Sequence, residues 1–268
     1  SMEKVMYPVW KPESQTTEAF REVLIGTLAD KMNELGASGY RVCVHDDFAA
    51  RSTSAKLENT KPHPDGMLSL WMDSANDFYR APFDQAIESV TAGFHGYLVA
   101  ESEPVPNTRY PVAKPGERTH GMCQVVMLRV PDRISYEEWL DIWRNSHSFV
   151  GIGTQSTFGY RQNSVVQPVT YAALEYDAFI EESFPEESMF SQEHYYDEQG
   201  EKTEQWDPLI DRYFPEAKTI RANNQHAARW QINALIMQES VKRFIDIGQD
   251  PHQTMKIDCM PYSEYVVK

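Results

Sequence analysis

The chain has 268 residues, of which 41% are hydrophobic and 24% are charged, with 13 Gly and 16 Pro. This composition is typical of a globular protein with a sizeable core, and it excludes a disulfide-stapled miniprotein, a collagen-like chain and a wholly disordered one. The 25 basic and 40 acidic residues give a net charge of −15, which disfavours nucleic acid and anionic membranes as partners. Apolar runs never approach the ~18 residues of a membrane span, so we expect a soluble protein.

The cysteines and the N-terminal sequence indicate the cellular compartment in which the protein is expected. Cys43, Cys123 and Cys259 are an odd number of cysteines without metal-ligand spacing. We therefore expect a reducing compartment, no disulfide framework and no metal. The chain begins SMEK, without the apolar segment of a secretory signal. Together these features predict a cytoplasmic protein.

The first half of the chain predicts the order β-α-β-β-α-β. Short apolar runs predict strands, and apolar residues at helical spacing predict helices. The strands are expected at 5–10, 39–45, 67–72 and 95–100, and the helices at 18–35 and 83–91. Pro8 would confine the first strand to an edge or a bulge. The polar stretch 49–66 shows no periodicity and is expected to be a loop.

The same order recurs in the second half, after a Pro-rich linker at residues 103–117. Ser135 and Glu138 form a capping box that predicts the start of a helix, and a second helix is expected at 227–247. The strands are expected at 122–130, 158–166, 172–184 and 262–267. The chain is thus interpreted as an N-terminal ferredoxin-like unit, 1–102, and a C-terminal unit, 118–268.

An acidic insertion near residues 185–229 breaks the symmetry of the two halves. From Glu175 to Glu201 the chain carries ten acidic residues and neither Lys nor Arg. A solvated, partly helical insertion is favoured over a lid above a pocket, because runs of charge usually cover a solvated surface.

Two such units predict a particular α+β architecture. Each four-stranded antiparallel sheet has helices on one face only, so its other face must be buried elsewhere. Packing the two bare faces together gives an α/β barrel with the helices outside. Because the linker makes this contact intramolecular, we expect either a monomer with an internal barrel or a homodimer.

The first candidate site residues lie on the predicted helix after Ser135 and on the strand that follows it. Trp139, Trp143 and His147 are spaced by four and share a helix face that should look toward the sheet. His147 is interpreted as a catalytic proton carrier, because histidine titrates near neutral pH. The alternative is a buried histidine that bonds a backbone carbonyl. Trp143 is a candidate for substrate binding.

The strand residues divide between two faces. Tyr160 shares one face with Gln162, while Arg161 and Asn163 share the other, because side chains alternate along a strand. Tyr160 is interpreted as a catalytic hydrogen-bond donor to a substrate oxygen, and Asn163 as a substrate-binding residue.

Two adjacent carboxylates, Glu181 and Glu182, are also candidates for substrate binding. As neighbours on a strand they point to opposite faces, so one must face inward if the strand is central. A carboxylate inside a barrel is costly unless it is paired or protonated. A structural ion pair with Arg129 or Arg161 is favoured over a general base.

Other histidines fit structural roles better. His45-Asp46-Asp47 reads as the polar end of a strand rather than as a catalytic or cation-binding cluster. His63 and His120 fall in predicted loops without partners.

Several segments of the second half resemble a known family. They are the helix 136–147, with an aromatic residue followed by His147, the strands 159–166 and 178–185, and the pair 243–246 and 263–266. In this order they resemble the EthD family of the dimeric α/β-barrel superfamily. The first half resembles the fold rather than the family motif. The superfamily includes cofactor-independent monooxygenases, polyketide cyclases, lactone isomerases, lyases and haem-dependent members, so the resemblance implies a small-molecule enzyme without choosing the reaction.

The absence of several motifs narrows the choice of reaction chemistry. The sequence has no HExxH, CxxC, P-loop, GxGxxG or GxSxG motif, which disfavours the corresponding metal, nucleotide and serine-hydrolase chemistries. We predict a cofactor-independent enzyme that acts on a small aromatic or polyketide-like compound by acid–base catalysis. A lyase, isomerase or cyclase in aromatic catabolism or secondary metabolism would fit, with Tyr160 stabilising an enolate or phenolate.

Two alternatives stay open. One is a non-catalytic small-molecule binding protein. The other is a monooxygenase, either cofactor-free or dependent on haem with His147 as a ligand.

Overall fold

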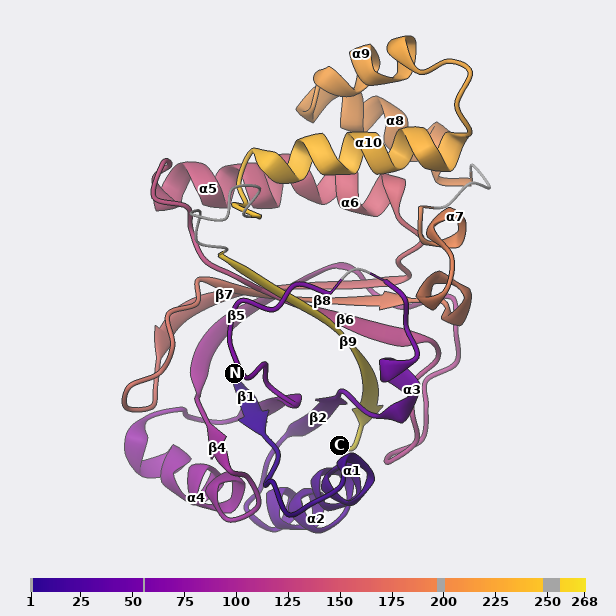
Figure 1. Cartoon of the computed structure of the whole chain (residues 1–268). Helices are drawn as coiled ribbons and strands as arrows, with labels where there is room; N and C mark the ends of the chain where they lie inside the picture. The colour runs from indigo at the N-terminus through magenta and orange to yellow at the C-terminus, as the bar shows by residue number, and fades with distance from the viewer. Residues whose placement is uncertain (1, 55, 197–200, 248–255) are drawn as a thin grey trace.

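The computed structural model describes residues 2–54, 56–196, 201–247 and 256–268. The fold is α+β, with an eight-stranded antiparallel barrel and helices packed outside it on two opposite sides (Figure 1). This is the architecture predicted from the sequence.

The first unit supplies four barrel strands in the order β5-β1-β3-β2. They are β1 (Glu3–Trp10), β2 (Gly39–Val44), β3 (Gly66–Met72) and β5 (Tyr97–Val105), and the short β4 (Gly93–Phe94) extends the pairing with β1. The helices of this unit are α1 (Thr17–Ile25), α2 (Thr27–Glu34), α3 (Asp47–Ala50) and α4 (Asp77–Glu88).

The second unit repeats this arrangement in the order β9-β6-β8-β7. Its strands are β6 (Met122–Leu128), β7 (Gly159–Pro168), β8 (Ala178–Phe184) and β9 (Ile257–Val266). Its covering helices are α5 (Tyr136–Ile142), the π-helical turn η1 (Trp143–His147), α6 (Ser148–Thr154) and α10 (Arg229–Lys242). The insertion contains η2 (Glu186–Met189), α7 (Gln192–Tyr195), α8 (Glu201–Tyr213) and α9 (Glu216–Asn223).

Two antiparallel seams join the units and close the barrel. One pairs β5 with β7, for example Glu101 with Asn163, and the other pairs β2 with β9, for example Arg41 with Val266. Closure leaves neither bare sheet face exposed, which was the physical reason to expect it.

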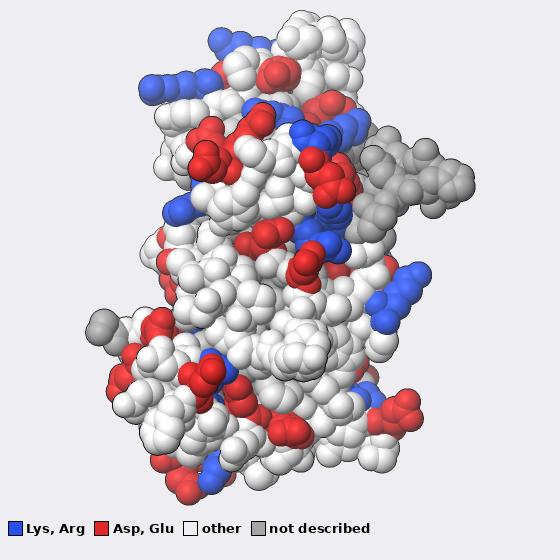
Figure 2. Space-filling model, turned by 90° about the vertical axis from the view of Figure 1, so that its left-hand side faces the viewer, with Lys and Arg blue, Asp and Glu red and all other residues white. Residues whose placement is uncertain are grey.

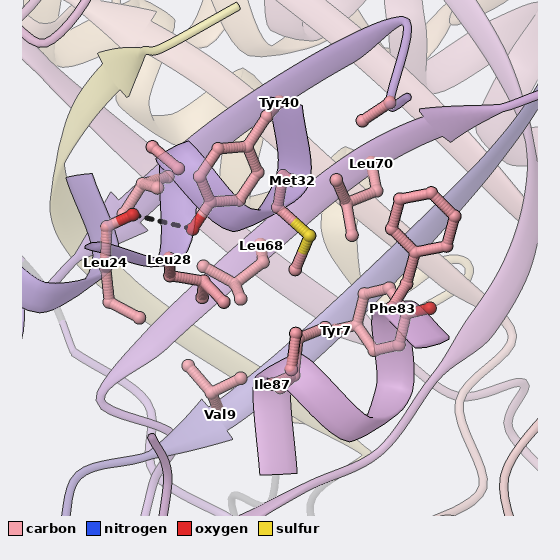
Figure 3. Close-up of a cluster of buried hydrophobic side chains, with 14 of the residues drawn as sticks. Tyr7, Val9, Leu24, Leu28, Met32, Tyr40, Leu68, Leu70, Phe83 and Ile87 are labelled. Carbon is pink, nitrogen blue, oxygen red and sulfur yellow. Dashed lines mark hydrogen bonds between the residues drawn. The ribbon is translucent and has the colours of Figure 1, made fainter. Parts of the chain in front are cut away.

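Apolar clusters fill the barrel and the space under the helices on each side. Figure 3 shows the cluster of the first unit, where Leu24, Leu28 and Met32 lie against strand residues such as Leu68. There the buried Tyr40 hydroxyl donates to the Leu24 carbonyl at 2.8 Å. The barrel interior holds a second cluster that includes Met6, Cys43, Met67, Tyr97, Val125, Phe179 and Tyr262.

Several predicted elements differ from the structure, among them one helix and two strands. The helix expected at 18–35 is divided at Gly26, whose backbone is not helical (φ −111°, ψ −92°). Residues 172–177 precede β8 rather than belonging to it, and Ala172 has a positive φ of 55°. The last strand begins at Ile257 rather than at Tyr262.

Both strand prolines are tolerated for local reasons. Pro8 lies on a barrel strand rather than on an edge strand. Along β1 it falls between the residues that pair with β5 and those that pair with β4, and it interrupts the pairing there because it has no N–H to donate. Pro261 pairs with Gln124 of β6 on one side. On its other side β2 has already ended at Val44, and the His45 ring bonds the Pro261 carbonyl at 2.7 Å.

Helices α8 and α9 form an outer layer on α6 and α10, away from the sheet (Figure 1). A Cβ atom on Gly153 of α6 would lie 2.7 Å from side-chain atoms of Trp206 and Ile210 on α8, so these two helices pack closely. The insertion is therefore largely a helical layer over the covering helices, while η2 and α7 pack beside the ends of β6 and β8.

Charged side chains of both signs lie next to one another on the face of the molecule in Figure 2, with an uncharged area across its middle. Among the described residues, no helix combines the length and the apolar character that a membrane span requires.

Gly121, at the start of β6, provides a test of the barrel. Its φ is +72°, and a Cβ atom there would lie 1.9 Å from the Phe184 carbonyl oxygen of β8. Gly121→Ala should therefore lower the free energy of unfolding by about 2 kcal/mol or more, measured by urea denaturation. Gly116→Ala is the matched control, because Gly116 has a φ of +85° but no atom within 4 Å of such a Cβ. Equal losses in both variants would contradict the close contact.

Candidate active site

The candidate site lies between the outer face of the C-terminal sheet and its covering helices. Ser135 caps the first of these helices by accepting from the Glu138 N–H. Trp139 and Trp143 then bury their indole rings with centroids 5.3 Å apart. The next turn, Trp143–His147, is π-helical. Such turns occur mostly as single insertions in α-helices, frequently at functional sites.

His147 is buried on the predicted helix face, 5% exposed. Its Nδ1 lies 2.8 Å from the Ser240 hydroxyl of α10, and its ring packs on Phe244 with centroids 4.6 Å apart. Burial, helped by the charge of Arg243, lowers the pKa of His147 to about 3. His147 is therefore neutral at pH 7, which makes it a weak proton acceptor.

Tyr160 of β7 lies on the sheet face under these helices. Its hydroxyl accepts from Gln162 Nε2 at 3.1 Å, and the same amide nitrogen donates to Ser148 Oγ at 2.8 Å. Burial, followed by the charge of Glu182, raises the pKa of Tyr160, so that its phenol keeps its proton at neutral pH. A protonated, positioned phenol is suited to donate to a developing oxyanion.

Glu182 occupies the centre of this face. It stands directly across from Tyr160 on β7 and from Gln124 on β6. Burial raises the pKa of Glu182 to about 7, opposed in part by the charge of Lys202. A carboxylate that titrates near neutral pH can take up and release protons under physiological conditions, which general acid–base catalysis requires.

Glu182 lines one cavity, and its neighbour across the sheet, Gln124, lines a second. The inner cavity is a narrow gap lined by His147, Gly151, Ile152, Thr157, Tyr160 and Glu182. The outer cavity has about 480 Å³, including its mouth at the surface, and is lined by Thr53, Ser54, Gln124, Ser188, Ser191, Gln192, Tyr195 and Tyr196. The structure thus brings His147, Trp143, Tyr160 and Glu182 to one helix–sheet interface.

Asn163 and Glu181 lie on the opposite face of the sheet, inside the barrel. Glu181 is 1% exposed and pairs with Lys4 at 3.0 Å and Arg161 at 3.1 Å, and Asn163 also accepts from Lys4, at 2.8 Å. Of the two partners predicted for Glu181, Arg161 is correct, whereas Arg129 pairs with Glu175. These two residues therefore belong to an ion network of the barrel, apart from the other candidates.

The remaining polar residues from the sequence have structural partners. Asp46 caps α3 and accepts from Ser263 at 2.6 Å. The expectation that His63 and His120 lack partners is wrong. His63 Nδ1 lies 2.9 Å from the Pro64 carbonyl, and His120 stacks on Tyr110 at a centroid distance of 3.6 Å.

Sequence reasoning missed several residues at the site. Ser240 comes from α10, and Tyr195 and Tyr196 come from the insertion. Lys202 approaches Glu182 while donating to the carbonyls of Ile152, Gln155 and Thr157. Two consecutive tyrosines within an acidic segment were the available signal, because aromatic side chains contribute a large area to cores and interfaces.

A haem does not fit beside His147 in this arrangement. The gap beside the ring is too narrow for a macrocycle, and Ser240 engages one ring nitrogen. Cys43, Cys123 and Glu264 have possible ligand atoms within 4.8 Å of one another in the barrel. Arg161 already bonds that carboxylate at 2.5 Å, and a hydrogen bond with Cys43, together with burial, raises the pKa of Cys123, so this group does not suit a cation.

Fold and site together define an α/β barrel of two ferredoxin-like units with a helix–sheet cavity. No protein-family model matches the sequence, and no curated protein is significantly similar to it. Solved structures with a similar chain course include an anthrone oxidase-like protein (10% identity, TM-score 0.45, covering 99% of this chain and 93% of that one). Another is a provisionally assigned monooxygenase from Lactobacillus acidophilus, with 8% identity and a TM-score of 0.42, where the match covers 98% of this chain and 94% of that one. A third is a mutant chlorite dismutase from Candidatus Nitrospira defluvii, with 7% identity and a TM-score of 0.39, where the match covers 98% of this chain and 91% of that one.

Proposed function

We propose that the protein is a cofactor-independent, EthD-like enzyme that moves a proton on a small aromatic or polyketide-like carbonyl compound. The observation that carries this proposal is Glu182, a carboxylate with a pKa of about 7 that faces the same cavity as Tyr160 and His147. Perturbed titratable groups that converge on a cavity are typical of catalytic sites.

In this proposal Glu182 takes a proton from the carbon next to the carbonyl group. The Tyr160 phenol donates a hydrogen bond to the carbonyl oxygen as negative charge develops on it. Neutral His147 contributes a second polar group to the same cavity. The proton carrier proposed here is thus Glu182 rather than His147, because burial keeps the pKa of the imidazole low.

Proton exchange on phenylacetone, a small aromatic ketone, tests this function. In D₂O the protein should accelerate loss of the α-proton signals in the NMR spectrum, with a rate that rises with pH and levels off above about pH 7. The rise follows because only the ionised form of Glu182 accepts a proton. Glu182→Gln should reduce the rate by about 10²- to 10⁴-fold.

Glu187→Gln is the matched control, since Glu187 is an exposed carboxylate of the same segment. Exchange no faster than in buffer, or unaffected by Glu182→Gln, would contradict the enzymatic proposal. Saturable quenching of tryptophan fluorescence by phenylacetone without exchange would instead favour the small-molecule binding protein.

A further inference from the structure

The outer cavity has a composition that points to the substrate. Each described residue that lines it is uncharged, and all eight carry a hydroxyl or an amide group: Thr53, Ser54, Gln124, Ser188, Ser191, Gln192, Tyr195 and Tyr196. Such a lining can exchange hydrogen bonds with neutral oxygens. Within the part of the lining that the structure describes, there is no cation to pair with a carboxylate or a phosphate, and no carboxylate to pair with an amine.

The outer cavity adjoins the proposed proton carrier. Gln124, which lines it, is paired directly across the sheet with Glu182. After burial, the charge of Glu182 is the next cause that raises the pKa of Tyr195 and of Tyr196. Gln124 therefore lies between Glu182 and the outer cavity on this face of the sheet.

The polar groups of this cavity are only partly occupied. Gln124 donates to Cys259 Sγ at 2.6 Å and accepts from the Tyr195 hydroxyl at 2.9 Å, so its side chain is held in a fixed orientation. The hydroxyl of Tyr196, in contrast, makes no hydrogen bond to any residue that the structure describes, although its side chain is partly buried. A partly buried phenol without a partner is costly unless a ligand or solvent satisfies it.

We propose that the outer cavity is a subsite for a phenolic hydroxyl of the substrate. The substrate class is then a small aryl ketone with a hydroxyl group on its ring. The ketone end meets Glu182 and Tyr160, and the ring hydroxyl bonds Tyr196 and the neighbouring hydroxyl and amide groups. This inference rests on the proposed function for the position of the ketone, and it adds the recognition of the opposite end.

The test compares 4-hydroxyphenylacetone with phenylacetone, which differ only in the ring hydroxyl. Dissociation constants measured by titration calorimetry should show about 3- to 10-fold tighter binding of the hydroxylated ketone, the usual effect of one neutral hydrogen bond. Tyr196→Phe should abolish this preference, because it removes the hydroxyl that would bond the ring hydroxyl of the substrate. Tyr171→Phe is the control, because Tyr171 is 99% exposed and lies outside the cavity.

Each remaining outcome has a defined meaning. Equal affinity for the two ketones, a preference that survives Tyr196→Phe, or no saturable binding of 4-hydroxyphenylacetone would overturn the subsite. Gln124→Leu, with folding checked by thermal melting, should reduce the preference independently. A preference that Tyr196→Phe removes, in a protein that does not catalyse exchange, would support the subsite and refute the enzymatic function.

Discussion

Glu181→Gln is expected to lower the free energy of unfolding by about 3–5 kcal/mol, which is the usual effect of removing one partner from a buried ion network. The carboxylate of Glu181 lies 3.0 Å from Lys4, 3.1 Å from Arg161 and 3.5 Å from Arg41. Without its charge, the carboxylates left to these three cations in the described part of the chain would be Glu101 and Glu264. Urea denaturation at pH 7 measures the loss.

Glu175→Gln is the control for this substitution. Glu175 is exposed and pairs with Arg129 at 3.2 Å, so its removal should change stability by less than about 1 kcal/mol. The neighbouring cations hold the pKa of Glu181 well below its usual range. Its contribution is therefore complete above the unfolded pKa and disappears as the pH falls through the folded pKa. A similar loss in the two variants would contradict the network.

Glu182→Gln should have the opposite effect on stability and should show it only at higher pH. The pKa of Glu182 is about 7 in the folded state and near 4.5 in the unfolded state. The folded protein therefore holds this proton more tightly, and the wild type loses stability as the pH rises from about 4.5 to 7. Glutamine, which resembles the protonated form, should stabilise the protein by up to about 3 kcal/mol at pH 8 and by almost nothing at pH 4.5.

Urea denaturation of the wild type and Glu182→Gln across this pH range measures the difference. Glu187→Gln should show no such pH-dependent gain, because Glu187 is exposed. A Glu182→Gln variant that is destabilised at pH 8 would show that the carboxylate is needed for folding. A gain in stability together with a loss of exchange activity would be the trade-off expected of a catalytic residue.

The sequence predicted those features of the site that follow from the periodicity of side chains along a single strand or helix. Alternation along strands separated Tyr160 from Asn163 and Glu181 from Glu182, and the structure places each pair on opposite faces of the sheet. Spacing by four placed His147 on the helix face that looks toward the sheet, where it is buried. Such relations hold within one element, so no knowledge of its neighbours is needed.

Features that depend on contacts between distant elements were not predictable in this way. The low pKa of His147 arises from burial under α10 and from Arg243, and the position of Tyr196 arises from the path of the insertion. Pro261 concealed the first half of β9, because a proline argues against a central strand. The strand tolerates Pro261 only because β2 ends at Val44, a fact of the assembled barrel.

The pairing of β9 with both β2 and β6 has a consequence for synthesis of the chain. During translation the first unit and most of the second emerge before β9 does, so the edges of β2 and β6 stay open until Ile257–Val266 leaves the ribosome. Contacts this distant in sequence slow folding, and open edges can pair with other chains. Aggregation in the cell should therefore depend strongly on the time that passes between the synthesis of β6 and the synthesis of β9.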